Sequence, residues 1–406
     1  MTARELTERF LSDEAALRHR QAEANRVIAA SGAAHLIHVA GDDGPASNGP
    51  WSLDPIPLVI DGNVFDDLAA AVRERVASLE LLLADLYGHR RVVRDGIVPA
   101  EALAASPRYR LAAIGVPPPP RWLVSYAVDV VADPTGRWRI VQDLTDTPTG
   151  IAYALLDRSV MARVAAELVG PAGAGDLASI SAFPAELRRA LAAVATVPSP
   201  RIVLFSDGVS DPAYVEHSAL ARLLGFHLVE SPDLVVRQRR LWLRTLGGLD
   251  PIDVVYRRTV DNAVDPIELS ATGTAGVPGL LFATAEGGVV LANAHGSGVL
   301  EDPDLAGFWP EAIAALTGSR PRLERLEGSP PYAPVPTLRG GRADSAAVVV
   351  RLHAVSGPDG VTVMAGGNGR VLAAGDDPRR PTARLAKDVW VIGAARPAPV
   401  LSLIHI

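Results

Sequence analysis

Residues 201–229 read RIVLFSDGVSDPAYVEHSALARLLGFHLV, and this stretch decides the fold class. Ile202–Phe205 is short and wholly apolar, as expected of a buried strand. Pro212 is a favourable first helical residue and Gly225 a favourable stop, so a helix is predicted between them, with a second strand at 226–229. Strand, helix and strand in this order predict neighbouring parallel strands. We therefore expect a Rossmann-like α/β domain over residues 201–320.

A predicted β-hairpin lies upstream of this domain. Residues 123–131 and 137–142 read as strands around the turn Asp133-Pro-Thr-Gly136. Asp129 lies on the first strand, and Gln142 and Asp143 end the second. Oxygen ligands at this spacing suit Mg²⁺, which usually takes one or two carboxylates together with substrate phosphates. The alternative, which spacing alone favours, is that Asp129 and Asp143 lie on the solvated face of the hairpin.

Charged residues follow the predicted strand near 253–257. Arg257, Arg258 and Asp261 stand at its carboxyl end, where ligands bind in open α/β sheets. Two adjacent arginines could hold a carboxylate or a phosphate group. The equally good alternative is one internal ion pair and one solvated arginine.

A loop with two glycines joins the predicted strand near 288–292 to the helix predicted near 303–317. The backbone N–H groups of Asn293, Gly296, Ser297 and Gly298 could cradle an anion there, although an ordinary tight turn is the simpler interpretation. Glu301 stands where a dinucleotide fingerprint needs its third glycine, so a dinucleotide-binding oxidoreductase is a distant alternative. His217 and His295 are isolated and predict no zinc site.

Composition excludes several kinds of chemistry. The 406 residues include no cysteine and a single lysine, Lys387, which follows an alanine, so thiol chemistry and a Walker A loop are both excluded. The net charge of −7 and the scattered arginines argue against a nucleic-acid partner. No apolar run is long enough for a membrane span, and no leader is recognisable, so we expect a soluble cytoplasmic protein.

The remaining chain divides into six further regions by composition and periodicity. Phe65, Leu68, Val72, Val76 and Leu79 keep the spacing of one helical stripe, which predicts the clearest helix. The expected regions are an N-terminal helix (1–32), a half-domain with the hairpin (33–170), a linker (171–200) in which 182–197 could be helical, an irregular segment (321–345), residual strands (346–395) and a tail (396–406). The tail ends in Leu-Ser-Leu-Ile-His-Ile, which back-translates to a sequencing adapter, so we expect it to be non-native.

Taken together, several segments resemble the circularly permuted type 2 ATP-grasp proteins, relatives of glutathionylspermidine synthetase. Their order covers about 35–320 almost continuously. The segments that carry the resemblance are 51–60, 85–88, 142–150 with 153–155, 216–225, Arg257-Arg258 with 265–269, 276–280, 293–300 and 387–390.

The resemblance implies an α+β, circularly permuted ATP-grasp fold and an ATP-dependent carboxylate–amine ligase. Its substrates would be a small-molecule acid and an amine or peptide, and it makes no prediction of an oligomer. By the same resemblance Mg²⁺ would lie on Asp129 and Asp143 with Gln142 beside them, Arg257 and Arg258 would hold the acyl substrate or phosphates, and residues 293–298 would cradle ATP. The catalytic set would be completed by Asp261.

This chain departs from the family pattern at the nucleotide lid. The lid should supply lysines, yet residues 320–345 contain none and are shorter than expected. Arg351, Arg370 and Lys387 could still meet phosphates, but arginine does not reproduce the geometry of lysine. We therefore also weigh a non-catalytic ATP-grasp relic that acts as a binding or scaffold module.

Overall fold

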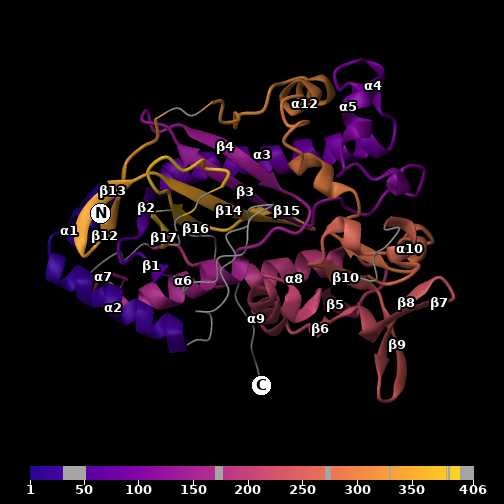
Figure 1. The fold of residues 1–406 in the computed structure, drawn as a ribbon, viewed down its shortest axis with the longest axis horizontal. Coiled ribbons are helices and arrows are strands. Elements are labelled where there is room, and N and C mark those ends of the chain that lie inside the picture. The colour runs from indigo at the N-terminus through magenta and orange to yellow at the C-terminus, as the bar shows by residue number, and fades with distance from the viewer. Residues whose placement is uncertain are drawn as a thin grey trace.

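The computed structural model describes residues 1–30, 52–169, 177–269, 276–328, 331–380, 382 and 385–393. Within these ranges the strands form an eight-stranded mixed sheet, a four-stranded parallel sheet and two smaller antiparallel sheets. The eight-stranded sheet occupies one end of the molecule and the parallel sheet the other (Figure 1). Residues 31–51, which include the start of the expected half-domain, and the tail after 393 lie outside the described residues, so the expectations for them stay untested.

The eight-stranded sheet joins segments that are far apart in the sequence. The predicted hairpin forms, and its first strand pairs antiparallel with β14, so that Asp129 stands opposite Arg351. Residues 346–393 therefore supply central strands of the sheet that 33–170 begins. The strands are β1 (Ser52–Leu53), β2 (Leu58–Asp61), β3 (Ser125–Ala132), β4 (Trp138–Leu144), β14 (Val348–Gly357), β15 (Gly360–Val363), β16 (Gly366–Val371) and β17 (Leu385–Ile392).

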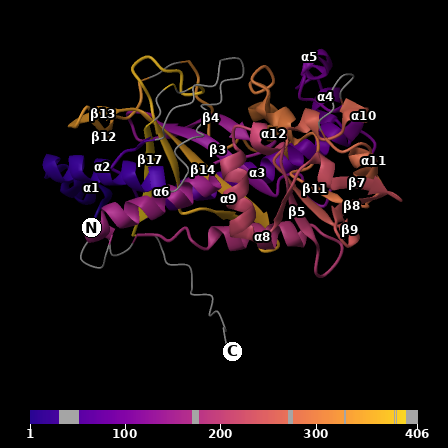
Figure 2. The same cartoon turned by 60° about the horizontal axis from the view of Figure 1, so that its bottom comes forward.

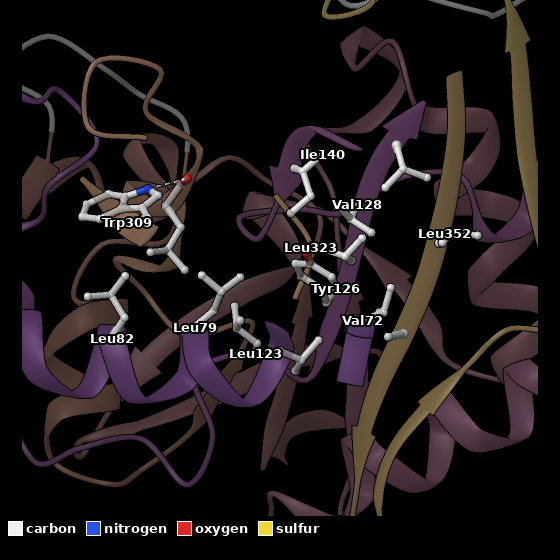
Figure 3. Close-up of a cluster of buried hydrophobic side chains, with 14 of the residues drawn as sticks. Val72, Leu79, Leu82, Leu123, Tyr126, Val128, Ile140, Trp309, Leu323 and Leu352 are labelled. Carbon is white, nitrogen blue, oxygen red and sulfur yellow. Dashed lines mark hydrogen bonds between the residues drawn. The ribbon is translucent and has the colours of Figure 1, made fainter. Parts of the chain in front are cut away.

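Helix α3 (Gly62–Tyr87) covers one face of this sheet. Its apolar stripe is buried as predicted, because Val72, Leu79 and Leu82 pack toward the strands and toward Trp309. Figure 3 shows these side chains beside Tyr126, Val128, Ile140 and Leu352 of the sheet. Burying one such leucine contributes about 1.5–3 kcal/mol, so this helix and sheet face form a main core of the protein.

Helices α6 (Ile151–Val164) and α8 (Phe183–Ala193) cover the opposite face, with α6 against β16 and β17 and α8 against β14. Figure 2 shows both helices along this side. The described part of the predicted linker, 177–200, therefore contains a packed helix, within the stretch 182–197 that could be helical. The N-terminal helix is two helices, α1 (Ala3–Leu11) and α2 (Glu14–Ala30), because Asp13 accepts hydrogen bonds from two backbone N–H groups at the start of the second.

The parallel sheet has the order β11-β10-β5-β6. Its strands are β5 (Ile202–Phe205), β6 (His227–Val229), β10 (Val254–Arg257) and β11 (Val290–Ala292). Helix α9 (Tyr214–Leu224) connects the first two and ends at Gly225, whose φ of 69° suits glycine. The strand–helix–strand prediction for 201–229 is thus confirmed as secondary structure, and its parallel pairing is observed.

The smaller elements complete the chain. Residues 335–346, expected to be irregular, form a hairpin of β12 (Val335–Arg339) and β13 (Arg342–Ala346), and the helix expected at 303 begins at Trp309. The other sheet contains β7 (Leu234–Arg237), β8 (Arg240–Thr245) and β9 (Gly248–Ile252). The remaining helices are α4 (Arg91–Arg94), α5 (Ala100–Ala105), α7 (Ala166–Val169), α10 (Pro266–Leu269), α11 (Leu280–Ala285) and α12 (Trp309–Thr317). Over the described ranges no helix has the length and apolar character needed to cross a membrane.

Candidate functional site

The register of β3 and β4 sets the direction of the predicted metal ligands. Asp129 pairs with Gln142, and Val128 pairs with Asp143. Because successive side chains of a strand point to opposite faces, Asp129 and Gln142 share one face while Asp143 lies on the other. The expectation that Asp129 and Asp143 hold one metal ion is therefore wrong for this structure, since the sheet itself separates them.

Asp129 is the centre of an arginine cluster on the face toward α6. Arg351 donates to both of its carboxylate oxygens, at 2.7 and 2.8 Å. Arg370 and Gln142 each donate to Oδ2, at 3.1 and 2.8 Å. Burial alone would raise the pKa of Asp129, but the two guanidinium groups outweigh it and hold that pKa well below its usual range. The solvated-face alternative is also wrong, because Asp129 is fully buried.

Asp143 forms a separate ion pair on the face toward α3. Arg75 donates Nε and Nη2 to its two oxygens, at 2.7 and 2.6 Å, and the Tyr126 hydroxyl donates to Oδ1 at 2.6 Å. Burial raises the pKa of Asp143, yet Arg75 lowers it by more, so the carboxylate stays charged. Arg75 and Asp143 thus act as a buried structural pair within the core.

The two predicted arginines at the carboxyl end of β10 have different surroundings. Arg257 lies 2.6 Å from Asp146 and donates to the Thr259 carbonyl at 2.8 Å, so it forms the internal ion pair that the sequence left open. Arg258 is buried and is not the solvated partner: it donates to the Thr147 carbonyl at 3.2 Å and lies 5.4 Å from the Tyr256 ring centroid.

Arg258 has no close counter-ion among the residues that the structure describes. Along the described chain no carboxylate lies within 4 Å of its guanidinium, and its Nε has no hydrogen-bond partner. The electrostatic influence of Arg258 reaches Glu216, a buried residue of α9 whose Oε2 is also unpartnered. Burial raises the pKa of Glu216, although Arg258 opposes the shift. A buried cation of this kind favours an anionic ligand nearby.

Asp261 and the loop 293–298 are tied to one another. Asp261 lies 2.6 Å from His295 Nδ1 and accepts from the Gly296 N–H at 2.9 Å and from Arg110 at 3.2 Å. Its carboxyl pKa is lowered, because His295 and Arg257 outweigh the effect of burial. The carboxylate is thus engaged by its own protein.

Two of the backbone N–H groups that were expected to cradle an anion have internal acceptors: that of Gly296 donates to Asp261, and that of Ser297 donates to the Ala294 carbonyl at 3.2 Å. The side chains of the same loop are engaged as well. Asn293 donates to the carbonyls of Ser125 and Thr145, both at 2.7 Å, and accepts from the Ser125 N–H. Ser297 Oγ donates to Thr145, and a Cβ at Gly298 would meet Asp146 at 3.3 Å. In this conformation the loop therefore binds the parallel sheet to the ends of β3 and β4, as a tight structural turn.

Lys387 does not lie with Arg351 and Arg370. It is paired with Gly369, next to Arg370 in β16, so it points to the other face of the sheet. Its Nζ donates to Asp54 and to the carbonyls of Ile56 and Pro336, at 2.6–2.8 Å, and its side chain is fully buried. All three ammonium protons have acceptors, so the expected contact with phosphates is wrong for this conformation.

One loop connects the charged groups of both sheets. Thr147 accepts from Arg258 of the parallel sheet, and Thr149 accepts from Arg351 through its carbonyl and hydroxyl oxygens. Gly150 donates to Glu216 at 2.5 Å and has a φ of 121°, and a Cβ there would meet His353 and Asn368. Arg258 and Arg351 are thus both held by one short segment, at Thr147 and Thr149.

The described residues fit a phosphate or carboxylate group better than a divalent metal. Over these ranges no group of three or more His, Asp or Glu side chains is arranged to hold a metal ion. The carboxylate of Asp129 is already paired with Arg351 and Arg370. Mg²⁺ binds carboxylate oxygens directly, and both oxygens of Asp129 are engaged by these guanidinium groups. The half-buried guanidinium groups of Arg351 and Arg370 could donate hydrogen bonds to an anion. The 480 Å³ cavity between 345–347 and 372–377 contains none of these residues.

Some of these residues were not predicted from the sequence. Arg75 was detectable, because it interrupts the apolar stripe of α3 between Val72 and Leu79. Thr149, Gly150 and Glu216 lie in segments that carry the family resemblance, but nothing in their spacing indicates that they meet. Their contacts depend on how the two sheets pack.

The chain belongs to the circularly permuted ATP-grasp type 2 family, whose model matches residues 57–331. This confirms the resemblance and the mixed α+β, circularly permuted ATP-grasp class, a family of the ATP-dependent ligase kind. An uncharacterized protein of Mycobacterium tuberculosis is 34% identical over 421 residues, which cover 88% of this chain and 47% of that protein.

Other relatives extend the comparison. An uncharacterized protein of Synechocystis sp. is 34% identical over 279 residues, covering 68% of this chain and 57% of its own. The chain thus spans about half the length of the curated relatives it matches. A glutathione synthetase-like effector from Globodera pallida is similar in structure, with a TM-score of 0.49 and 10% identity over 94% of this chain and 98% of its own.

Proposed function

We propose that the chain is an ATP-dependent carboxylate–amine ligase that forms an amide or peptide bond between a small-molecule acid and an amine or peptide. In such a reaction a carboxylate oxygen attacks the γ-phosphorus of ATP and ADP leaves. The amine nitrogen then attacks the acyl phosphate carbonyl, and inorganic phosphate leaves. Both steps develop negative charge, which guanidinium groups stabilise.

The observation that carries this proposal is the convergence of arginines from two sheets on one loop. Arg258, which directly follows β10, and Arg351 from β14 donate to Thr147 and Thr149, two residues apart. In the proposed reaction Arg258, which has no carboxylate within 4 Å along the described chain, orients the acyl carboxylate. Arg351 and Arg370 hold phosphate oxygens, and Arg257 with Asp261 keeps the loops in place.

A second candidate is a non-catalytic ATP-grasp module that keeps this binding surface. Its support is that Asp129, Asp143 and Lys387, three residues expected to serve metal or nucleotide, are each satisfied by internal partners. Such a protein would recognise an anion and pass it on, or serve as a scaffold in the longer protein. It would not release phosphate from ATP.

Phosphate release distinguishes the two candidates. The ligase proposal expects ATP-dependent release of inorganic phosphate with at least one member of a panel of amino acids and short peptides, and its loss in Arg258→Met. Arg73→Met, at an exposed position of α3, is the matched control. If no acid and amine pair releases phosphate while millimolar ATP still raises the melting temperature, the binding module is correct, because a ligand of the folded state must stabilise it.

A further inference from the structure

The Asp129 cluster carries more positive than negative charge. Arg351 and Arg370 face one carboxylate, so one guanidinium charge is left without a matched acidic partner inside the cluster. The side chains of Arg351 and Arg370 are 14% and 28% exposed, whereas that of Asp129 is 0% exposed. The unmatched positive charge is therefore on the accessible side of the cluster.

The donors have a defined orientation. Arg351 is fixed by two hydrogen bonds to Asp129 and by Thr149. Within the described part of the chain, Arg370 makes one side-chain hydrogen bond, from Nη2 to Asp129 at 3.1 Å. Gln142 donates to Asp129 from the neighbouring strand. Arg370 therefore has the most remaining donor capacity, since a guanidinium offers five N–H donors.

From this geometry we propose that Asp129, Arg351 and Arg370 form a metal-independent phosphate site in which Asp129 is an internal competitor of the ligand. A phosphate oxyanion takes over the Arg370 donors and shares those of Arg351, and the carboxylate of Asp129 competes for the same guanidinium groups. The inference rests on the proposed nucleotide-binding role of Arg351 and Arg370, but it reverses the expected role of Asp129. A metal ligand would attract the phosphate through an ion, whereas a competitor weakens its binding.

Two further carboxyl groups and one histidine act electrostatically on the cluster. Glu216 and Glu301 exert an electrostatic effect on Arg351, and His353 lies two residues further along β14 on the same face. Burial lowers the pKa of His353 to about 4, so it adds no charge at neutral pH. The pKa of Glu216 is raised by burial, which reduces its own competition for the arginine.

Equilibrium binding of ATP and of inorganic tripolyphosphate to the full chain, each measured by calorimetry in EDTA, tests the proposal. We expect both to bind without metal and the affinity of Asp129→Asn to be about tenfold higher, because two guanidinium groups lose their competitor. Asp67→Asn, the same charge change on the exposed side of α3, should leave the affinity unchanged. If Asp129→Asn abolishes binding, or if wild-type binding requires Mg²⁺, the proposal is overturned.

A second variant, Arg370→Gln, tests the phosphate site if Asp129→Asn does not fold. Arg370→Gln leaves the Asp129–Arg351 pair intact and should lower the affinity for both ligands by about tenfold in EDTA. Arg73→Gln is the matched control on an exposed position of α3. Unchanged affinity in Arg370→Gln contradicts the site. If ATP and tripolyphosphate bind as expected but no phosphate is released in the ligase assay, only the ligase proposal is contradicted. The ligase proposal and the phosphate-site proposal can therefore fail separately.

Discussion

The carboxylates of Asp129 and Asp143 lie on opposite faces of one sheet, although they are a single register position apart on paired strands. Each is enclosed by its own cations, Arg351 and Arg370 for Asp129 and Arg75 with the more distant Arg325 for Asp143. This relationship separates a solvent-accessible charged cluster from a core ion pair. It also makes the two residues respond differently to mutation.

Asp143→Asn is expected to destabilise the fold without any link to metal. It leaves the Arg75 guanidinium buried and uncompensated, which costs about 3–5 kcal/mol in the free energy of unfolding. Urea unfolding measures this, with Asp67→Asn as a control expected to stay within about 0.5 kcal/mol of wild type. A stable Asp143→Asn protein that had lost a Mg²⁺-dependent stabilisation would show that Asp143 is a metal ligand after all.

Lys387→Met is expected to act through Asp54 rather than through nucleotide. The lysine is the only one in the chain, and its removal leaves the Asp54 carboxylate buried beside Thr337, at a cost of about 3–5 kcal/mol. In a double-mutant cycle with Asp54→Asn, the double variant should lose clearly less stability than the sum of the single variants. If the losses of stability in the two single variants were additive, or if Lys387→Met lowered the affinity for ATP without lowering stability, Lys387 would instead contact the phosphates of the nucleotide.

Asn293→Ala should weaken the connection between the two sheets. It removes three hydrogen bonds to the backbone of Ser125 and Thr145 in a buried place, and each unsatisfied group costs about 1–3 kcal/mol. Chemical denaturation should therefore show a clear loss of stability. Were Asn293 a nucleotide ligand instead, ATP affinity would fall and stability would remain.

Glu301 should make stability depend on pH near neutrality. Burial and the neighbouring Asp146 raise its pKa to about 7 from an ordinary 4.5, so the folded state retains a proton there that the unfolded chain has lost. The stability that protonated Glu301 contributes to the folded state is complete below pH 4.5. It is lost as the pH rises through 7, and the free energy of unfolding falls by up to about 1.4 kcal/mol per pH unit.

Comparison with Glu301→Gln isolates the part of the pH-dependent stability that is due to Glu301. The difference in unfolding free energy between wild type and the variant should shift against wild type as pH rises from 5 to 8. Urea titrations across that range at constant ionic strength measure it. A difference that is flat, or that shifts toward wild type, would show that Arg108 and the two backbone N–H donors keep Glu301 ionised throughout.

Much of the architecture follows from local patterns. The apolar stripe of α3, the hairpin of β3 and β4, and the strand–helix–strand unit at 201–229 were all predicted, because periodicity and turn residues act over a few positions. The division of the N-terminal helix and the hairpin at 335–346 were missed. The first depends on a single capping aspartate, Asp13, and the second is a short pair of polar strands, so neither gives a strong pattern in the sequence.

By itself the sequence determined the family, the main helices and strands, and the set of charged residues that the site could use. Only the tertiary structure decided which of them meet. Arg351 reaches Asp129 across more than two hundred residues because β14 pairs with β3, and the same register turns Lys387 and Asp143 to the other face. Strand alternation is local, but the register between distant strands is set by packing the whole core, and that register decides on which face of the sheet each charge lies and which partners it meets.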